Sequence, residues 1–484
     1  MASELALLNN ALIGNPERAP IKVVQFGTGA FLKGFINAIF DDLNQRPGAE
    51  PMGIAAVKLR AGNEQQIDQI NAQDGLFTLN VSGLRDGAVV NDFRIIQSQV
   101  VALSPYQDEQ GFNRLSYLPE LQWLVSNSTE AGIVYDQRDI DSSVLAQSFP
   151  GKLTQFLYRR WQHFDGAAER GLNILCCELI ADNGSQLQQL VQRYADSWQL
   201  PPAFAAWVDD HCLFLNTLVD RIVPGKPASL QSKPDYIDNE LIECETYYLL
   251  AIECNARSRP VLEQWLAGLA EHNIVLTEDL QPYRERKVKI LNGGHTAVAP
   301  IAALLQIPLV LDAMGDEQVS LFMSRLMHQE IAATFAGHDP EVVRAYIETI
   351  LQRFRNPFLQ HKWRDILLNT ISKWRIRLLP ALAQYCACND LPPRHLVVAV
   401  AALLIAYRPG SGVELRDEPA SLEALAEVWQ QSGSSLEVVR GLFSHSALLA
   451  HADLAQQSGL HSAIAHAIDR IDAEGLRGYL AEIL

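Results

Sequence analysis

Cysteine is scarce in this sequence: the chain of 484 residues has seven, and an odd number cannot all pair in disulfides. A sparse, odd set of thiols is typical of a reducing compartment, whereas small secreted proteins are rich in disulfides. Residues 1–20 include Glu4, Glu17 and Arg18 and lack the basic start and long apolar run of a targeting signal. These absences predict a cytoplasmic protein.

Long apolar runs and an excess of positive charge are missing too. The most apolar stretch, Leu396–Tyr407, is well short of the ~20 residues that a membrane-spanning helix needs. The chain has 39 Lys and Arg residues against 56 Asp and Glu residues, so its formal net charge is −17. A field of that sign repels phosphate backbones and anionic lipids. The sequence therefore predicts neither nucleic acid nor a membrane as a partner.

The cysteine spacing gives no metal site. Cys386 and Cys388 form a Cys-x-Cys pair, but no second pair lies nearby to complete the ligands of a structural zinc ion. The composition, 48% hydrophobic and 20% charged, is that of an ordinary globular protein. We expect a folded chain that needs no metal ion.

Strand and helix patterns alternate in the first part of the chain. The apolar runs at 21–27 and 52–59 predict strands, and the remaining strand candidates lie at 77–83, 122–128 and 171–180. From about Val319 onward, amphipathic helical patterns dominate. We therefore expect an α/β Rossmann-type domain with a parallel sheet over residues 1–283. A mostly α-helical domain should follow over residues 284–484, with the functional site between the two.

A glycine-rich turn follows the first predicted strand and reads G-x-G-x-x-L. Gly27 permits a tight turn, and Gly29 allows the backbone to approach a pyrophosphate at the start of the next helix. Leu32 stands where a third glycine is usual, and Gly34 follows two residues later. We predict that this turn binds a dinucleotide through Phe26, Gly27, Thr28, Gly29, Ala30, Phe31 and Leu32.

The end of the second strand leaves the choice of cofactor open. A carboxylate that binds the ribose is expected about 20 residues beyond the glycines, but the tip of this strand has none. Asn63 and Glu64 are candidates for bonding a ribose hydroxyl. Lys58 and Arg60 can instead receive the 2′-phosphate of NADP, unless both are solvated surface cations.

The segment 284–295 begins with four cations, one of which is Lys287, and continues with Asn292 and His295. In a helix with 100° per residue, Asn292 lies at ~140° and His295 at ~80° from Lys287, so the three can face one pocket. Positive neighbours disfavour an ammonium group and lower a lysine pKa toward the range of proton transfer. The alternative is a basic surface turn with a core histidine behind it.

Three motifs in order resemble the polyol-specific long-chain dehydrogenase family, which includes mannitol dehydrogenase: GTGAFLKGF at 27–35, LNTLVDRIVPG at 215–225 and KVKILNGGH at 287–295. Further segments, from QDGLFT at 73–78 to RFRNPFLQHK at 353–362, are similar to its hexuronate-reductase branch. The resemblance implies a Rossmann domain followed by a helical domain, no catalytic metal, and NAD as cofactor, with NADP still possible.

The resemblance also implies roles for single residues. Lys287 matches the general acid/base of the family, and Asn292 and His295 match its partners. Asn183, in ADNG, matches the asparagine that helps to hold the reacting oxygen. Glu130, in STEAG, matches an acid beside the active site that relays protons.

Asp220, in VDRIVP, matches an aspartate near the nicotinamide and the substrate. Its alternative role is an ion pair, with Arg221 or another cation, that braces the loop. Arg60 and Asp220 therefore join residues 26–32 as the residues that we expect to bind the dinucleotide.

One departure from the polyol pattern concerns the substrate. Polyol dehydrogenases of this family tend to carry Asp shortly after the Asn-Pro that is found here at 356–357, whereas this chain has His361 and Lys362. A cationic pair suits a sugar that carries a carboxylate, and Arg355 adds a further cation. Each of the three can also be a simple surface charge.

The resemblance therefore implies reduction of the keto group of D-tagaturonate to D-altronate by NADH, and the reverse oxidation. The alternatives are reduction of the epimer fructuronate, a mannitol 2-dehydrogenase-like activity on neutral polyols, and a dinucleotide sensor without chemistry. Intact Lys287, Asn292 and His295 argue against a sensor. We expect a small-molecule substrate and a monomer.

Overall fold

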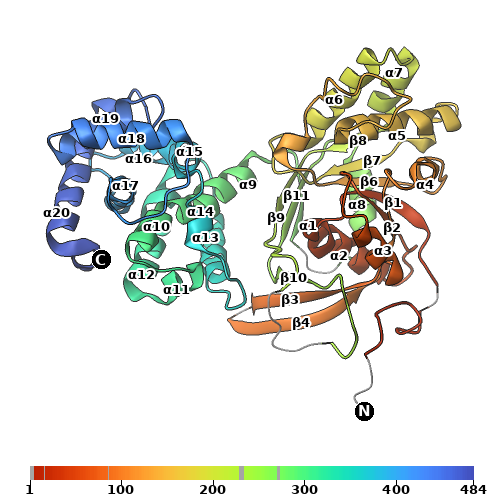
Figure 1. The fold of residues 1–484 in the computed structure, drawn as a ribbon, viewed down its shortest axis with the longest axis horizontal. Helices are drawn as coiled ribbons and strands as arrows, with labels where there is room; N and C mark the ends of the chain where they lie inside the picture. The colour runs from red at the N-terminus through yellow and green to blue at the C-terminus, as the bar shows by residue number, and fades with distance from the viewer. Residues whose placement is uncertain (1–4, 16, 86, 228–233, 270–272) are drawn as a thin grey trace. The chain divides into compact units, whose positions relative to one another are not determined.

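The computed structural model describes residues 5–15, 17–85, 87–227, 234–269 and 273–484 (Figure 1). Two compact units divide the chain. One comprises Met1–Arg85 and Val89–Leu280, and the other comprises Asp86–Ala88 and Gln281–Leu484. From Gln281 onward the chain is helical, apart from one isolated β-bridge between Leu309 and Lys362 among the described residues.

The first unit is built on a six-stranded parallel sheet. Its strand order is β5-β2-β1-β6-β7-β8, and each neighbouring pair is parallel. The strands are β1 (Ile21–Phe26), β2 (Gly53–Val57), β5 (Gln99–Leu103), β6 (Trp123–Ser126), β7 (Asn173–Cys176) and β8 (Leu213–Leu215). The strand order reverses between β1 and β6, where doubly wound sheets bind their ligands at the carboxyl ends of the strands. The predicted Rossmann-type domain is confirmed.

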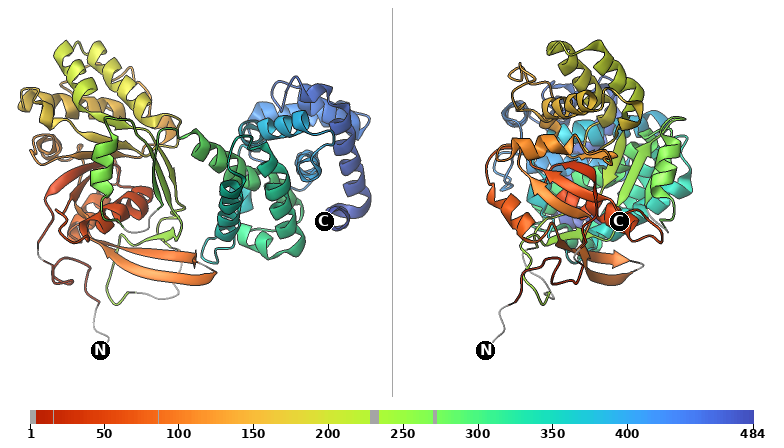
Figure 2. Two further views of the ribbon diagram at one scale, coloured as in Figure 1. Left: turned by 180° about the vertical axis from the view of Figure 1, so that it is seen from behind. Right: turned by 90° about the vertical axis from the view of Figure 1, so that its right-hand side faces the viewer.

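Helices cover both faces of this sheet (Figures 1 and 2). On one face, Phe26 of β1 meets Phe156 of α5 at 5.9 Å between ring centroids, and on the other Phe40 of α2 meets Trp265 of α8 at 5.5 Å. The helices are α1 (Ala30–Leu32), η1 (Lys33–Asn37), α2 (Ala38–Asn44), α3 (Gln65–Ala72), α4 (Glu109–Leu115), α5 (Phe149–His163), α6 (Asn183–Ser197), α7 (Pro202–His211) and α8 (Arg259–Leu266). Two buried apolar clusters therefore fix the sheet.

Two small sheets complete this unit, in the orders β10-β3-β4 and β12-β11-β9. Their strands are β3 (Phe77–Arg85), β4 (Ala88–Ile96), β9 (Thr217–Asp220), β10 (Ile242–Glu245), β11 (Leu249–Glu253) and β12 (Ile274–Thr277). The strand candidate at 77–83 thus lies outside the main parallel sheet, because β3 pairs with β10 and β4 instead. The candidates at 122–128 and 171–180 contain β6 and β7 of the main sheet.

The second unit is a helical bundle around α17 (Arg394–Ala406), which α10 and α20 contact. The other helices are α9 (Gln281–Arg286), η4 (Lys287–Asn292), α10 (Gly293–Leu304), α11 (Val310–Gly315), α12 (Glu317–Arg325), η5 (Leu326–Ile331), α13 (Pro340–Phe354), α14 (Trp363–Ile366), α15 (Thr370–Arg377), α16 (Leu379–Cys388), α18 (Pro419–Gln431), α19 (Ser435–Ser444) and α20 (Ser458–Ile483). All but the first residue of α17 are buried, as expected of a helix that is apolar on every side. Within the described residues, no helix has the length and hydropathy needed to cross a bilayer.

Candidate active site

The glycine turn lies between β1 and α1, at the point where the sheet reverses its strand order. Gly27 has φ of +132°, a conformation that L side chains rarely adopt, so the turn requires glycine there. A Cβ on Gly29 would meet nothing within 4 Å, and no side chain caps the helix that follows. This open backbone with free N–H groups fits a pyrophosphate, which a side chain at residue 29 would obstruct.

Gly34 takes the packing role of the third glycine. A Cβ on this residue would lie 2.7 Å from Cγ1 of Val223, which is closer than real side chains come. Arg221 donates to the carbonyl of Gly34 at 2.7 Å and to the carbonyl of Glu245 at 2.9 Å. Arg221 therefore braces the loop through backbone oxygens. Asp220, at the end of β9, is 5% exposed.

The contacts of the loop after β2 change which residues are candidates for binding the cofactor. Lys58 is buried, and its Nζ donates to the carbonyl of Asn63 at 2.6 Å. Its ammonium group is therefore engaged, whereas Arg60 is exposed. Glu64 accepts from the N–H of Gly62 at 3.2 Å through Oε1, while its Oε2 is a buried atom without a hydrogen-bond partner.

The segment after β6 is pinned to the segment after β7. Asn127 donates to the carbonyl of Cys177 at 2.5 Å, and the N–H of Ser128 donates to Oε1 of Glu178 at 3.0 Å. Glu178 is 2% exposed, and burial raises its pKa. Glu130 follows at the start of a 3₁₀ turn, but its side chain lies outside the described part of the structure. Its proton-relay role stays a prediction.

Asn183 has no hydrogen-bonding capacity left for a reacting oxygen. Its Nδ2 donates to the carbonyls of Cys176, Glu178 and Thr217 at 2.9, 3.0 and 3.2 Å. Its Oδ1 accepts from the N–H groups of Gly184 and Thr217 at 3.0 and 2.9 Å. The amide is 1% exposed and fully used. Asn183 therefore joins three chain segments, and its role in holding a substrate oxygen stays a prediction.

The Lys287–Asn292 segment is a π-helix. The N–H of Gly293 donates to the carbonyl of Val288, five residues earlier. Where hydrogen bonds join residues five apart, such residues also lie about one turn apart, so Lys287 and Asn292 share a face. The uniform 100° step of the sequence analysis is wrong here, and the π-turn aligns the two residues better. His295 follows in the first turn of α10, three residues after Asn292.

Two neighbouring cations of this segment, Arg286 and Lys289, have local partners. Lys289 forms an ion pair with Glu285 at 2.6 Å and also donates to the carbonyl of Thr334 at 3.2 Å. Arg286 lies over the ring of Tyr283, 4.6 Å from its centroid. Lys287 is half-buried. The segment is thus more than the exposed basic turn that was the alternative.

His295 is held in an aromatic box. Its ring stacks on Phe354 with centroids 4.1 Å apart and meets the edges of His361 and Trp363 at 5.1 and 5.9 Å. The side chain is 7% exposed, and Nε2 is a buried atom without a hydrogen-bond partner. Burial and nearby positive charges hold the pKa of His295 well below its usual range, so the imidazole is neutral at pH 7. A buried nitrogen of this kind is suited to a ligand.

The positive charges around His295 come from residues that the sequence analysis missed. The buried Arg353 ends α13, while Lys373 and Arg377 lie one turn apart on α15. Burial, aided by the charge of Arg377, lowers the pKa of Lys373 to about 8. The spacing of Lys373 and Arg377 within the helical pattern at 370–377 is the signal that could have revealed them.

Of the three predicted carboxylate ligands, Arg355, His361 and Lys362, His361 has a ring contact with His295. Arg355 is exposed at the C-cap of α13. His361 does contact His295, but burial lowers its pKa, so it carries no positive charge at pH 7. Lys362 lines a separate, mainly apolar cavity of about 430 Å³ together with Leu309. His361 and Lys362 therefore do not form a pair of positive charges at pH 7, and their contact with a substrate carboxylate stays a prediction.

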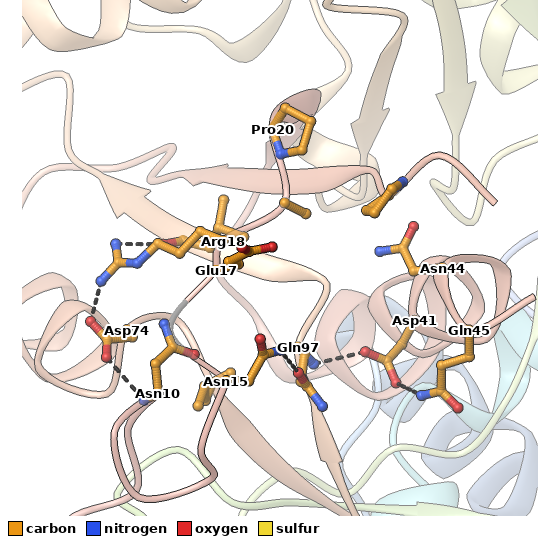
Figure 3. A pocket seen from close by; sticks show the side chains of 14 residues that line it. Asn10, Asn15, Glu17, Arg18, Pro20, Asp41, Asn44, Gln45, Asp74 and Gln97 are labelled. Carbon is orange, nitrogen blue, oxygen red and sulfur yellow. Dashed lines mark hydrogen bonds and ion pairs between the residues drawn. The ribbon is translucent and has the colours of Figure 1, made fainter. Parts of the chain in front are cut away.

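A polar pocket of about 380 Å³ lies at the opposite edge of the main sheet, beside the residues that precede β1, β2 and β5 (Figure 3). Its side chains bind one another: Asp41 accepts from the N–H of Gln97 at 2.7 Å and from Gln45 at 2.8 Å, and Arg18 pairs with Asp74. Ligands of parallel α/β sheets bind at the carboxyl ends of strands, so this pocket is not the dinucleotide site. Among the described residues, no group of three or more His, Cys, Asp or Glu side chains can hold a metal ion.

Gly29, in the turn, and Gly34, in η1, should respond differently to replacement by alanine. We expect Gly34→Ala to lower the free energy of unfolding by about 1–3 kcal/mol, because the methyl group overpacks against Val223. Gly29→Ala should keep the wild-type stability and weaken dinucleotide binding. Urea unfolding and fluorescence titration measure the two effects, and equal stability of both variants would contradict the packing role of Gly34.

Replacing Asn183 tests whether it is structural. Asn183→Ala leaves buried carbonyl and N–H groups unpaired, so we expect a loss of about 2–4 kcal/mol in the free energy of unfolding. Asn389→Ala is the control, since Asn389 is exposed at the end of α16. Unchanged stability of Asn183→Ala, together with a large fall in turnover, would contradict a purely structural role and support the catalytic one.

Comparison with known proteins covers both units. The family model of the mannitol dehydrogenase Rossmann domain matches residues 21–264, and that of the mannitol dehydrogenase C-terminal domain matches residues 279–472. An altronate oxidoreductase of Bacillus subtilis (strain 168) is 36% identical over 480 residues, covering 98% of both chains. An altronate oxidoreductase of Klebsiella pneumoniae (strain 342) is 37% identical over 95% of this chain and 96% of its own.

Two solved structures share the fold. A D-sorbitol dehydrogenase in substrate-free form has a TM-score of 0.79 and 18% identity over 98% of this chain and 100% of its own. A mannitol 2-dehydrogenase of Pseudomonas fluorescens, in ternary complex with NAD and D-mannitol, has a TM-score of 0.67 and 20% identity over 100% of this chain and 97% of its own. By its two matching domains and its full-length relatives, this chain belongs to the mannitol dehydrogenase family.

Proposed function

We propose that this protein is an NAD-dependent tagaturonate reductase, which interconverts D-tagaturonate plus NADH with D-altronate plus NAD⁺. The observation that carries the proposal is the π-turn, which brings Lys287 and Asn292 to one face just before His295. The near full-length similarity to altronate oxidoreductases supports the substrate and the reaction.

The first unit provides residues that fit a dinucleotide. Gly27 and Gly29 leave the backbone open for the pyrophosphate, and Asp220 lies at the end of β9 for the nicotinamide side. Glu64 has a carboxylate oxygen without a partner, which suits a ribose hydroxyl and repels a 2′-phosphate. Because Lys58 is engaged with Asn63, NAD is favoured over NADP, and Arg60 is left as a candidate for contact with the adenosine half. When bound, NADH supplies the hydride for the ketone carbon.

The second unit provides the groups that transfer a proton to and from the substrate oxygen. Lys287 donates a proton to the ketone oxygen as negative charge develops on it, and takes the proton back in the reverse direction. The side-chain amide of Asn292 donates a hydrogen bond to the same oxygen. A positioned donor of this type stabilises developing charge best where water is excluded. His295, neutral and clamped by Phe354, presents its unpaired Nε2 to a substrate hydroxyl.

Parallel assays of NADH oxidation test the proposal. We expect turnover with tagaturonate to exceed turnover with fructuronate and with fructose. Faster turnover of fructuronate would show specificity for the other epimer, and faster turnover of fructose would show a polyol dehydrogenase. If the protein binds NADH but oxidises it with none of the three sugars, it is a dinucleotide sensor.

Lys287→Ala tests the proton donor. We expect turnover to fall by about 10²–10⁴, the usual contribution of a positioned acid or base, while NADH binding stays near the wild-type value. An added small amine should restore part of the rate by entering the vacated space. Lys289→Met, two residues away, removes a charge that is already paired with Glu285 and serves as the control.

Retention of more than about a tenth of wild-type turnover by Lys287→Ala would be inconsistent with the assignment, because that loss is far below the expected range. Glu130 and His295 would then be the next residues to replace. A similar fall in both lysine variants would indicate a general effect of charge on the segment.

A further inference from the structure

Arg377 is a half-buried cation that has no carboxylate partner in the described part of the chain. It lies at the end of α15, and its Nη1 donates to Oγ1 of Thr296 at 3.1 Å. No ion pair joins Arg377 to an acidic side chain of the described residues. Proteins rarely remove a charge from water without pairing it, so a charge left in this state is expected to meet an anion from outside the chain.

The position of Arg377 links it to the proposed catalytic groups. Thr296 follows His295 directly, and its own hydroxyl donates to the carbonyl of Asn292 at 2.7 Å. Helix α15 packs against both α10 and η4, which carry these residues. The charge of Arg377 also contributes to the low pKa of His295, which places the guanidinium close to that ring.

The guanidinium has donors to spare. Among the described residues, Nη1 is the one guanidinium nitrogen of Arg377 that donates a hydrogen bond. Nη2 and Nε make no such bond, and they are not buried atoms, so solvent can reach both. A planar guanidinium with two free N–H edges matches the two oxygens of a carboxylate. The other cations are less suitable: Lys373 donates to the carbonyl of Ile366 at 2.7 Å, and Arg355 is exposed.

We propose that Arg377 binds the carboxylate of the sugar acid and thereby selects keto-uronates over neutral ketoses. This inference rests on the proposed reduction of a keto-uronate. It moves the specificity of the site from residues 355–362, where the sequence analysis placed it, to the last turn of α15.

The test compares Arg377→Met, Arg377→Lys and the wild type. Binding of D-altronate and of altritol, its neutral counterpart, is measured by calorimetry in the presence of NAD⁺. We expect Arg377→Met to weaken altronate binding about 10- to 100-fold, the value of a charge-assisted hydrogen-bonded pair, and to leave altritol binding unchanged. The affinity of Arg377→Lys for altronate should lie between those of the wild type and Arg377→Met. Lysine keeps the positive charge but lacks the two parallel N–H donors of the guanidinium. The KM for tagaturonate should rise in the same order, with smaller changes in kcat.

Two further variants separate recognition from support of the fold. Thr296→Val removes the hydroxyl that joins Arg377 to Asn292 but keeps the charge, so it should retain the preference for altronate over altritol. Arg355→Met removes an exposed cation from the same unit and should bind both ligands as the wild type does.

Equal weakening of altronate and altritol by Arg377→Met, reproduced by Thr296→Val, would show that Arg377 only braces the helix. Unchanged altronate binding by Arg377→Met would place the carboxylate elsewhere. Either result refutes this inference while a wild type that reduces tagaturonate still upholds the proposed function. A wild type that reduces no keto-uronate refutes the proposed function itself.

Discussion

The backbone hydrogen bonding of residues 287–293 is the constraint on which the proposed chemistry depends. A regular α-helix would place Lys287 and Asn292 well apart around the axis, whereas bonds that join residues five apart bring them to one face. Such turns are rare because they sacrifice regular helical packing, and they concentrate at functional sites. Here the π-turn runs directly into α10, whose first turn carries His295. A single irregularity of backbone therefore sets the spacing of the three residues to which we assign the chemistry.

Hydrogen bonding to the backbone has the same role in the first unit. Asn183 ties β7, the start of α6 and the start of β9 together, and Arg221 ties the loop after β9 to the helix of the glycine turn. These side chains donate their hydrogen bonds to backbone carbonyls. Hydrogen bonds thus join the segments at the carboxyl edge of the sheet, and Gly29 lies in open space at the point where the strand order reverses. Preorganised edges of this kind are what a dinucleotide requires.

The sequence analysis predicted the parallel sheet and the strand, turn and helix around Gly27 correctly, because each depends on local pattern. The catalytic roles of Lys287, Asn292 and His295 stay predictions. The sequence analysis could not show features that depend on tertiary contacts. The polarity of Asn183 suggested chemistry, but only the fold shows that its amide is fully used. The sequence analysis also assigned a positive charge to His361 from its residue type, whereas burial lowers the pKa of this side chain. Arg377 was missed because its spacing from Lys373 indicates a shared helix face but does not indicate that this face packs beside residue 296.

A crystal structure of the protein with NAD⁺ and D-altronate tests the central claim most directly. The account predicts that Nζ of Lys287 and Nδ2 of Asn292 both lie within hydrogen-bond reach, about 2.6–3.2 Å, of the oxygen that becomes the ketone. It also predicts that the π-turn persists in the complex. A regular α-helix over residues 287–293, or a substrate oxygen that only one of the two side chains reaches, would contradict it.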